Sequence, residues 1–339
     1  MSTEAQTADF IDIAGAPDIL GLRFRNFRGD EDYPAMLEVN NGSKVVDDLG
    51  HDLHTLDTIR YVYGTTPNHD PLHDVLIAEV DGKMVAFNRV FWYSELEGDR
   101  IYMHFGFVLP EWRGKGLGRR MIGRAEDRAR EIDAAQSDKA PALLETSAYI
   151  SQPAIENLLR EAGYEPVRYE YHMMTEDLEH IPEVPMPEGL EVRPALPEHY
   201  HAIWHANAEA FQDHWGATPI DEQDFANMMK DPLVDPSLWM VAWDGDQVAG
   251  SILNFINRDF NKRTGRELGY TESISVRRPW RRKGLARALL ARSMDMFKNM
   301  GMTQTALGVD TQNPSGALQL YESMGYKVIS QSTVYRKPL

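Results

Sequence analysis

The chain has 339 residues, of which 42% are hydrophobic and 26% charged; its formal net charge is −17 and it contains no cysteine. The length suits two domains of about 150–170 residues, and the missing cysteines exclude disulfides, a thiolate nucleophile and Cys-ligated zinc. The negative charge argues against nucleic acid as a partner and favours cationic small molecules, unless acidity serves solubility alone.

Residues 1–20 form a polar lead-in that we expect to be disordered. The first ten residues lack the basic and apolar regions of a secretory signal. No stretch of the chain approaches the roughly 20 apolar residues of a membrane span. With the absence of cysteine, these features predict a cytoplasmic protein that has no membrane partner. The sequence leaves open whether it is a monomer or a homodimer.

The first half is predicted to be a mixed α/β unit. Alternating apolar residues mark its strands, an Asp-Gly pair marks a hairpin, and helical periodicity marks its helices. In chain order we expect a strand at Leu22–Arg25, a hairpin at Leu76–Ala86, a strand at Arg100–Val108, a helix over about 116–132, a strand at Ala142–Tyr149, a helix at Pro153–Glu161 and a closing strand from Gly163-Tyr164 onward.

The second half repeats this order of elements. We expect a strand at Leu190–Arg193, a hairpin at Trp239–Gly250, a strand at Glu267–Val276, a helix over about 284–300, a strand at Gln304–Asp310, a helix at Pro314–Met324 and a closing strand from Gly325-Tyr326 onward. Residues 257–266 are expected to be an exposed basic hairpin loop. The acidic, Pro-rich stretch 176–189 is predicted to be a linker between domains at 21–175 and 190–339.

A glycine-rich turn is the clearest feature of the repeat. Trp112-Arg113-Gly114-Lys115-Gly116-Leu117-Gly118 recurs 168 residues later as Trp280-Arg281-Arg282-Lys283-Gly284-Leu285-Ala286. Each copy follows an apolar strand and opens a helix. Glycines let a ligand approach the backbone, and the free N–H groups of a first helical turn bind phosphate. Two copies in the same setting indicate a duplicated unit built around a phosphate-bearing ligand, rather than two ordinary strand-to-helix turns.

These residues resemble the GNAT acyltransferases, the Gcn5-related N-acetyltransferase family. The resemblance covers nearly the whole chain after residue 20, and in plan it is similar to the tandem GNAT enzymes of the mycothiol synthase type. It implies an α/β fold class with two tandem GNAT folds, each a mixed, mostly antiparallel central sheet flanked by helices. It also implies acetyl-CoA (coenzyme A) as co-substrate and no metal.

The resemblance also implies which residues bind the coenzyme. The loop amides would hold the pyrophosphate, and the strand before the loop would splay so that its backbone meets the pantetheine arm. In the second half these residues are Ile274, Val276, Arg281, Arg282, Lys283, Gly284, Leu285, Ala286, Arg287 and Asn313. In the first half they are Val108, Arg113, Gly114, Lys115, Gly116, Leu117, Gly118 and Arg119.

Acetyl transfer to an amine needs a base, an oxyanion donor and a group that assists the leaving thiolate. Glu272 matches the family's base position, although it could also be a solvent-facing strand carboxylate. Tyr321 matches the tyrosine whose hydroxyl faces the coenzyme sulfur, unless it has only a packing role. Asn313 would cap the helix that follows it and could also hydrogen-bond the coenzyme. The backbone near Ile274–Val276 would polarise the carbonyl.

The first half departs from this pattern. Leu159 stands where the second half has Tyr321, Ser151 stands in place of Asn313, and His104 aligns with Glu272. His104 has a pKa suited to a base, but a strand histidine is more often a hydrogen-bonded structural residue. We therefore expect the N-terminal domain to be catalytically degenerate, with coenzyme binding left open.

The sequence thus predicts an N-acetyltransferase that moves an acetyl group from acetyl-CoA to a primary amine of a small molecule. Transfer would be direct, in a ternary complex at the C-terminal domain, since no cysteine is present to carry the acyl group. The alternative is a non-catalytic acyl-CoA-binding sensor or scaffold. Asp213, His214 and Trp215 are either acceptor contacts or a packed turn, and both interpretations stay open.

Overall fold

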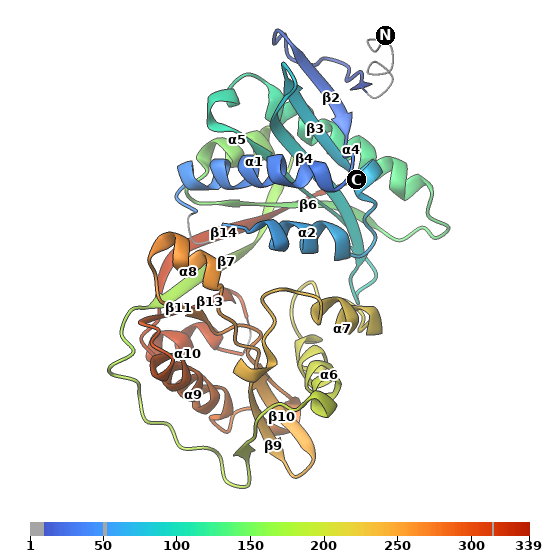
Figure 1. Ribbon diagram of the computed structural model, residues 1–339. Coiled ribbons are helices and arrows are strands. Elements are labelled where there is room, and N and C mark those ends of the chain that lie inside the picture. The colour runs from blue at the N-terminus through green and yellow to red at the C-terminus, as the bar shows by residue number, and fades with distance from the viewer. Residues whose placement is uncertain (1–9, 50–52, 314) are drawn as a thin grey trace. The chain divides into compact units, whose positions relative to one another are not determined.

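The computed structural model describes residues 10–49, 53–313 and 315–339, which fall into two compact units (Figure 1). Unit 1 contains the chain up to Val167 together with Thr333–Leu339, and unit 2 contains Arg168–Ser332. In each unit, strands that are mostly antiparallel lie between helices on two faces. The predicted α/β class with two similar units is therefore confirmed.

Unit 1 is built on strands that pair in the order β1-β2-β3-β4-β5-β6, antiparallel except for the parallel pair β5–β6. Its elements are β1 (Phe10–Ile11), β2 (Leu22–Asn26), α1 (Tyr33–Val46), α2 (Leu56–Thr65), α3 (Pro71–Asp74), β3 (Val75–Val80), β4 (Lys83–Ser94), β5 (Arg100–Val108), α4 (Leu117–Ala134), β6 (Ala142–Tyr149) and α5 (Pro153–Glu161).

Alternation along the strands of unit 1 creates two apolar faces. Val75 and Ile77 on β3 pack with α1 and α2 in one cluster. Leu76 and Ala78, one residue out of phase, pack with Leu117 of α4 in another. A strand buried on both faces reads as a continuous apolar run, because helices cover both sides of the sheet.

Unit 2 contains a four-stranded antiparallel sheet, β12-β10-β9-β8, and a ladder β11-β13-β7. Two strands, β7 (Glu165–Thr175) and β14 (Lys327–Pro338), extend from one unit into the other. Its own elements are β8 (Glu191–Val192), α6 (Tyr200–Phe211), α7 (Glu222–Met228), β9 (Met240–Asp244), β10 (Gln247–Ile252), α8 (Arg258–Thr264), β11 (Leu268–Tyr270), β12 (Ser275–Val276), α9 (Leu285–Asn299), β13 (Gln304–Asp310) and α10 (Ala317–Ser323).

The core of unit 2 follows the same rule as that of unit 1. Val241 and Trp243 of β9 pack with Ile203 of α6. Ala242, which points to the other face, packs with Leu289 of α9. The long apolar side of α9 therefore fixes the helix that begins at the glycine-rich turn against the centre of the sheet.

The two units do not end where the repeats end. Arg168–Thr175 belong to unit 2, and Thr333–Leu339 belong to unit 1. The sequence placed these segments in the domains 21–175 and 190–339. The difference arises because a closing strand can satisfy its backbone groups on any matching sheet edge, and its own residue pattern does not name that edge.

The lead-in is more ordered than its polar composition predicted. Phe10 and Ile11 pair with Arg25 and Phe24 of β2, and Ile13 packs with the cluster under α4. The expectation of disorder is therefore wrong for residues 10–20, because three isoleucines spaced among polar residues bury enough apolar surface to fix the segment. Residues 1–9, to which the same expectation applied, lie outside the described residues.

The segment expected as an exposed basic hairpin loop contains the helix α8. Asn257 accepts a hydrogen bond from the Phe260 N–H at 2.9 Å, and Gly265 ends the helix in the left-handed region at φ 68°. Phe260 is buried. The cap residue and the single buried aromatic were the signals of this helix, and the surrounding charges obscured them.

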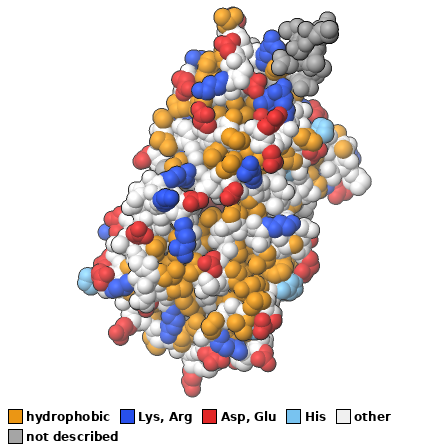
Figure 2. Space-filling model, viewed as in Figure 1, with side chains coloured by type: hydrophobic (Ala, Val, Ile, Leu, Met, Phe, Trp, Pro, Cys, Tyr) orange, Lys and Arg blue, Asp and Glu red, His pale blue; other side chains and the backbone are white. Residues whose placement is uncertain are grey.

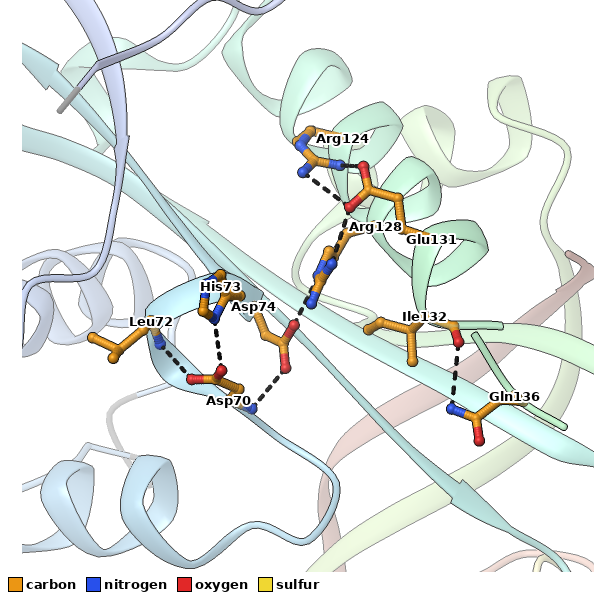
Figure 3. Close-up of polar contacts among 9 residues, drawn as sticks. All are labelled: Asp70, Leu72, His73, Asp74, Arg124, Arg128, Glu131, Ile132 and Gln136. Atoms are coloured by element: carbon orange, nitrogen blue, oxygen red, sulfur yellow. Dashed lines mark hydrogen bonds and ion pairs between the residues drawn. The ribbon is translucent and has the colours of Figure 1, made fainter. Parts of the chain in front are cut away.

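Ion pairs tie α3 to α4 in unit 1 (Figure 3). Arg128 donates to Asp74 at 2.8 Å and contacts Glu131 at 3.0 Å, and Glu131 also pairs with Arg124 at 2.8 Å. The Asp74 carboxylate also accepts from the Asp70 N–H at 2.7 Å. Asp74 is buried, so this network holds the start of β3 against the α4 helix.

On the face shown in Figure 2, basic and acidic side chains are interspersed, and the visible surface carries no extended basic field. Among the helices of residues 10–49, 53–313 and 315–339, none combines the length and apolar character that crossing a bilayer requires.

Replacing Arg25 by Leu should destabilise the protein by about 3 kcal/mol or more, because two buried carboxylates would lose their counter-ion. Arg25 contacts Asp32 at 2.7 Å and Glu79 at 2.7 Å, and all three side chains are buried. Urea unfolding of the full chain measures the change. The matched variant Arg23→Leu, on the exposed side of β2, should change stability by less than about 1 kcal/mol. Equal effects of the two substitutions would contradict this account.

Candidate active site

The third strand of unit 2 is broken, and the break opens the site. Leu268–Tyr270 pair with Gln304–Ala306 of β13, whereas Ser275–Val276 pair with β10. Ser273 lies between them with φ 51°, a conformation that is costly for a residue with a side chain. The sequence predicted one continuous strand at Glu267–Val276, and that expectation is wrong at this point because the pairing with β13 ends at Thr271, although the segment that follows β10 still bonds to Tyr270 and Glu272.

Beyond the break, alternate backbone groups turn away from β10. The Arg277 N–H donates to the Ala249 carbonyl at 3.0 Å, so the antiparallel pattern directs the polar groups of Ile274 and Val276 to the opposite edge. The Val276 carbonyl accepts there from Arg281 Nε at 2.9 Å. The Ile274 backbone thus faces the space that β13 has left, as the predicted splay requires.

The glycine-rich turn has the same backbone in both units. Gly284 precedes α9 with φ 82°, and Gly116 precedes α4 with φ 91°. Two residues earlier, Arg282 and Gly114 also have positive φ, at 61° and 72°. This turn presents the first N–H groups of the helix, where the positive end of the helix dipole adds to their attraction for an anion.

The first arginine of each turn braces the fold. Arg281 donates to the carbonyls of Val276 and Ala210 and pairs with Asp213 at 2.6 Å. Asp213 also pairs with Arg278, and these two guanidiniums hold the pKa of its carboxyl well below the usual range. Asp213 therefore secures the turn at the end of α6. Because the Arg281 guanidinium is already engaged, only the backbone of Arg281 is left to contact a phosphate.

Arg113 makes the equivalent contacts in unit 1. It donates to the carbonyls of Val108 and Ser43 and pairs with Asp47 at 2.5 Å. Arg119 pairs with Glu161, and Lys115 lies 4.4 Å from the centre of the Trp112 ring. The side chains predicted to bind coenzyme in unit 1 are thus engaged in contacts with their own unit.

A pocket of about 750 Å³ lies between the splayed strands of unit 2 and reaches the glycine-rich turn. Its lining includes both predicted catalytic residues and all of the predicted coenzyme ligands of this unit except Lys283. These residues are Glu272, Tyr321, Ile274, Val276, Arg281, Arg282, Gly284, Leu285, Ala286, Arg287 and Asn313. The structure therefore brings into one pocket residues that are far apart in the sequence.

Glu272 lies at the break of the strand, where its carboxylate accepts from the Gly308 N–H at 3.0 Å. Burial among the pocket walls, with the nearby charge of Glu170, raises the pKa of Glu272 to about 7, although the Gly308 N–H opposes this shift. A carboxyl group that titrates near neutral pH can accept a proton and release it again, which is the property of a general base.

Tyr321 is a buried residue of α10 whose hydroxyl shares the pocket with Glu272. Burial and the nearby Glu272 charge raise the pKa of Tyr321 above its ordinary range, so this hydroxyl keeps its proton. Tyr326, by contrast, is held by Thr305 at 2.7 Å and Thr271 at 3.1 Å. Tyr321 is therefore the tyrosine of the pair that can donate to a ligand.

Sequence reasoning missed the contribution of β7. Arg168, Glu170 and His172 line the pocket from this strand, which closes the first repeat but belongs to unit 2 from Arg168 onward. No signal within the strand indicates which sheet it joins. His214 and Trp215, for which the sequence left a packing role open, also line the pocket.

In the corresponding region of unit 1, β5 and β6 also stop pairing after Met103, but side chains beside this gap contact one another. His104, aligned with Glu272, is buried and lies 2.7 Å from the Tyr164 hydroxyl, and burial lowers its pKa to about 4. Asp47, the counterpart of Asp213, accepts a hydrogen bond from Gln152 at 2.7 Å. His104 thus has the structural role that was the commoner interpretation.

Two further differences occur at the positions where unit 2 has Gly308 and Tyr321. The strand registers align Gly308 with Thr146, because Ala306 faces Tyr270 and Leu144 faces Tyr102. Thr146 is buried, and Leu159, at the position of Tyr321, is part of the core.

No group of three or more His, Asp or Glu side chains suited to hold a metal ion occurs within the described residues of either unit.

Comparison with known proteins identifies the family to which this fold and its pocket belong. Residues 43–156 and 200–326 match the Acetyltransferase (GNAT) family. The chain therefore belongs to this family of N-acetyltransferases and contains two GNAT domains.

Relatives and solved structures share the tandem plan. The mycothiol acetyltransferase of Geodermatophilus obscurus is 28% identical over 257 residues, which cover 75% of this chain and 78% of that protein. A GCN5-related N-acetyltransferase from Sphaerobacter thermophilus superposes with a TM-score of 0.72 at 24% identity, covering 95% of this chain and 96% of the other. A tandem GNAT protein from the clavulanic acid biosynthesis pathway superposes with a TM-score of 0.67 at 14% identity, covering 94% of this chain and 98% of the other.

The Glu272 carboxyl should titrate with a midpoint of about 7, protonated below it and charged above it. Glu170→Gln removes a neighbouring negative charge, so the midpoint should fall toward the ordinary value for glutamate. Carbon-13 NMR of protein labelled at glutamate measures the midpoint. The signal that is absent in Glu272→Gln is assigned to the Glu272 carboxyl. Glu322→Gln, an exposed change on α10, should leave the midpoint unchanged. A native midpoint near 4.5 would contradict the electrostatic description.

Proposed function

We propose that unit 2 transfers the acetyl group of acetyl-CoA directly to a primary amine of a small molecule. The observation that carries the proposal is the convergence of Glu272, Tyr321 and the Ile274 backbone on one pocket that ends at the glycine-rich turn. A base, an oxyanion donor and a hydroxyl are the three groups that the reaction needs. In unit 2 the segment between β11 and β12 supplies the first two groups, and α10 supplies the hydroxyl.

The turn before α9 suits the pyrophosphate of the coenzyme. Its N–H groups follow Gly284, and the basic side chains of Arg282 and Arg287 line the same end of the pocket. The backbone edge at Ile274 and Val276 lies between this end and Glu272, where it can hydrogen-bond an extended pantetheine arm. Asn313 accepts from the Ser315 N–H at 2.9 Å, so capping already accounts for its carbonyl oxygen.

Glu272 and Tyr321 carry out the proton transfers of the proposed reaction. Glu272 accepts a proton from the incoming ammonium, directly or through a water, and the freed nitrogen attacks the thioester carbonyl carbon. The Ile274 N–H stabilises the oxyanion as the tetrahedral intermediate forms. The carbon–sulfur bond then breaks, and Tyr321 donates its proton to the departing thiolate. The nitrogen of the intermediate passes its second proton to Tyr321, and Glu272 releases the proton it took to solvent, which completes the cycle.

Unit 1 is proposed to be a non-catalytic relative that does not hold coenzyme. It keeps the turn at Gly116 but has Leu159 in place of the hydroxyl and His104 engaged with Tyr164. The Gln152 side chain donates to Asp47, the counterpart of Asp213, beside the same turn. A role of unit 1 in supporting unit 2 fits this arrangement.

Tyr321→Phe should lower turnover by roughly 100-fold, the smaller end of the range for losing a general acid, while acetyl-CoA affinity stays nearly unchanged. Thiol release in the presence of an amine panel measures turnover, and calorimetry measures affinity. The control Tyr270→Phe removes a hydroxyl from β11 outside the pocket and should leave both unchanged. Full activity of Tyr321→Phe would remove Tyr321 from the mechanism, and absence of amine-dependent thiol release in the native protein would contradict the proposed function.

A further inference from the structure

The pocket of unit 2 contains one carboxylate without a counter-ion more than the chemistry uses. Glu170, Asp213, Glu272 and Asp310 all line it, and Asp213 is paired with Arg278 and Arg281. Asp310 is neutralised by Arg168, whose guanidinium lies 2.6 Å from it and also donates to Gln312 at 2.7 Å. Within the described residues, neither Glu170 nor Glu272 has a cationic partner at ion-pair distance.

Strand register places Glu170 on the floor of the pocket. In the antiparallel pair β7–β13, Glu170 faces Asp310 and His172 faces Gly308, so these residues share one face of the ladder. The Gly308 N–H holds the Glu272 carboxylate at 3.0 Å, and Gly308 has no side chain to separate Glu272 from β7. The exposed Glu170 carboxylate contacts the Ser332 hydroxyl at 3.4 Å and otherwise faces the open pocket.

Two carboxylates without counter-ions in a partly enclosed pocket attract positive charge. An acceptor with one ammonium supplies that charge only until Glu272 removes its proton, after which Glu170 is again unpaired. An acceptor with a second ammonium keeps a charge on Glu170 throughout the reaction. Phe211 and Trp215 line the same pocket, and the Trp215 side chain is 39% exposed, which suits the methylene groups between two amines.

We propose that Glu170 is a specificity-determining residue that selects acceptors with a second positive charge, so that the substrate class is a di- or polyamine. This inference rests on the proposed function of unit 2 and refines it. The selecting residue comes from β7, the closing strand of the first repeat. The first repeat thus contributes a residue to the acceptor-binding part of the pocket in unit 2, although unit 1 itself is proposed to be non-catalytic.

The experiment compares butane-1,4-diamine with pentylamine, which matches it in heavy-atom count but has one amine, and includes spermidine and glucosamine. Initial rates of thiol release give kcat/KM for each acceptor at pH 7.5. The native protein should prefer the diamine to pentylamine by on the order of tenfold, the effect of one charge-assisted contact at a half-open site. In Glu170→Gln this ratio should fall to near one, chiefly through a higher KM for the diamine.

Two further variants separate charge recognition from a structural effect. Glu170→Asp, which keeps the charge, should restore part of the preference. Glu322→Gln on the exposed side of α10 should leave the ratio at its native value. A merely structural role of Glu170 would lower kcat for all acceptors alike and leave the ratio unchanged, which would overturn the inference.

The other outcomes distinguish this inference from the proposed function. Equal use of pentylamine and the diamine, or acetylation of glucosamine alone, would overturn the selection of a second charge while leaving the acetyltransferase proposal intact. Preference for the diamine that persists in Glu170→Gln would assign the selection to another residue. No thiol release with any amine would contradict both proposals.

Discussion

The loss of a neighbouring strand on one edge of the chain at Ser273 is the constraint on which the site depends. Up to Thr271 the chain is held by β13, whereas its other edge is held throughout by β10 and the residues that follow β10. A backbone that loses the strand on one edge leaves its polar groups there without a partner, and those groups need a ligand. Glu272 lies where the pairing ends, fixed by the Gly308 N–H across the opening. The local strain at Ser273 thus creates the space and positions the base.

Duplication preserved the scaffold in both units but not the residues beside the gap between the strands. Arg113 and Arg281 make matching contacts with the end of the preceding strand and with the first helix, so this support behind the turn is common to both. Under the proposal that unit 1 does not react, its side chains that face the gap are free to change, whereas the two arginines support folding in either case.

The sequence was sufficient for the repeated plan, the glycine-rich turns and the residues around them. Those features are local, because a turn needs glycine at positive φ and a helix shows its own period. The position of β7 could not be found this way, since pairing at a sheet edge is a property of the whole chain. The end of the strand at Tyr270, the order of residues 10–20 and the helix α8 were missed for related reasons. Each depends on a few buried contacts that composition does not reveal.

The central claim is that one working coenzyme site exists per chain and lies in unit 2. Calorimetric titration of the full chain with acetyl-CoA tests it most directly, together with a matched pair of charge reversals in the two turns. The account predicts one site, weakened at least about tenfold by Arg287→Glu, as expected when a basic group beside a phosphate becomes acidic, and unchanged by Arg119→Glu. Two sites, or a single site weakened only by Arg119→Glu, would contradict it.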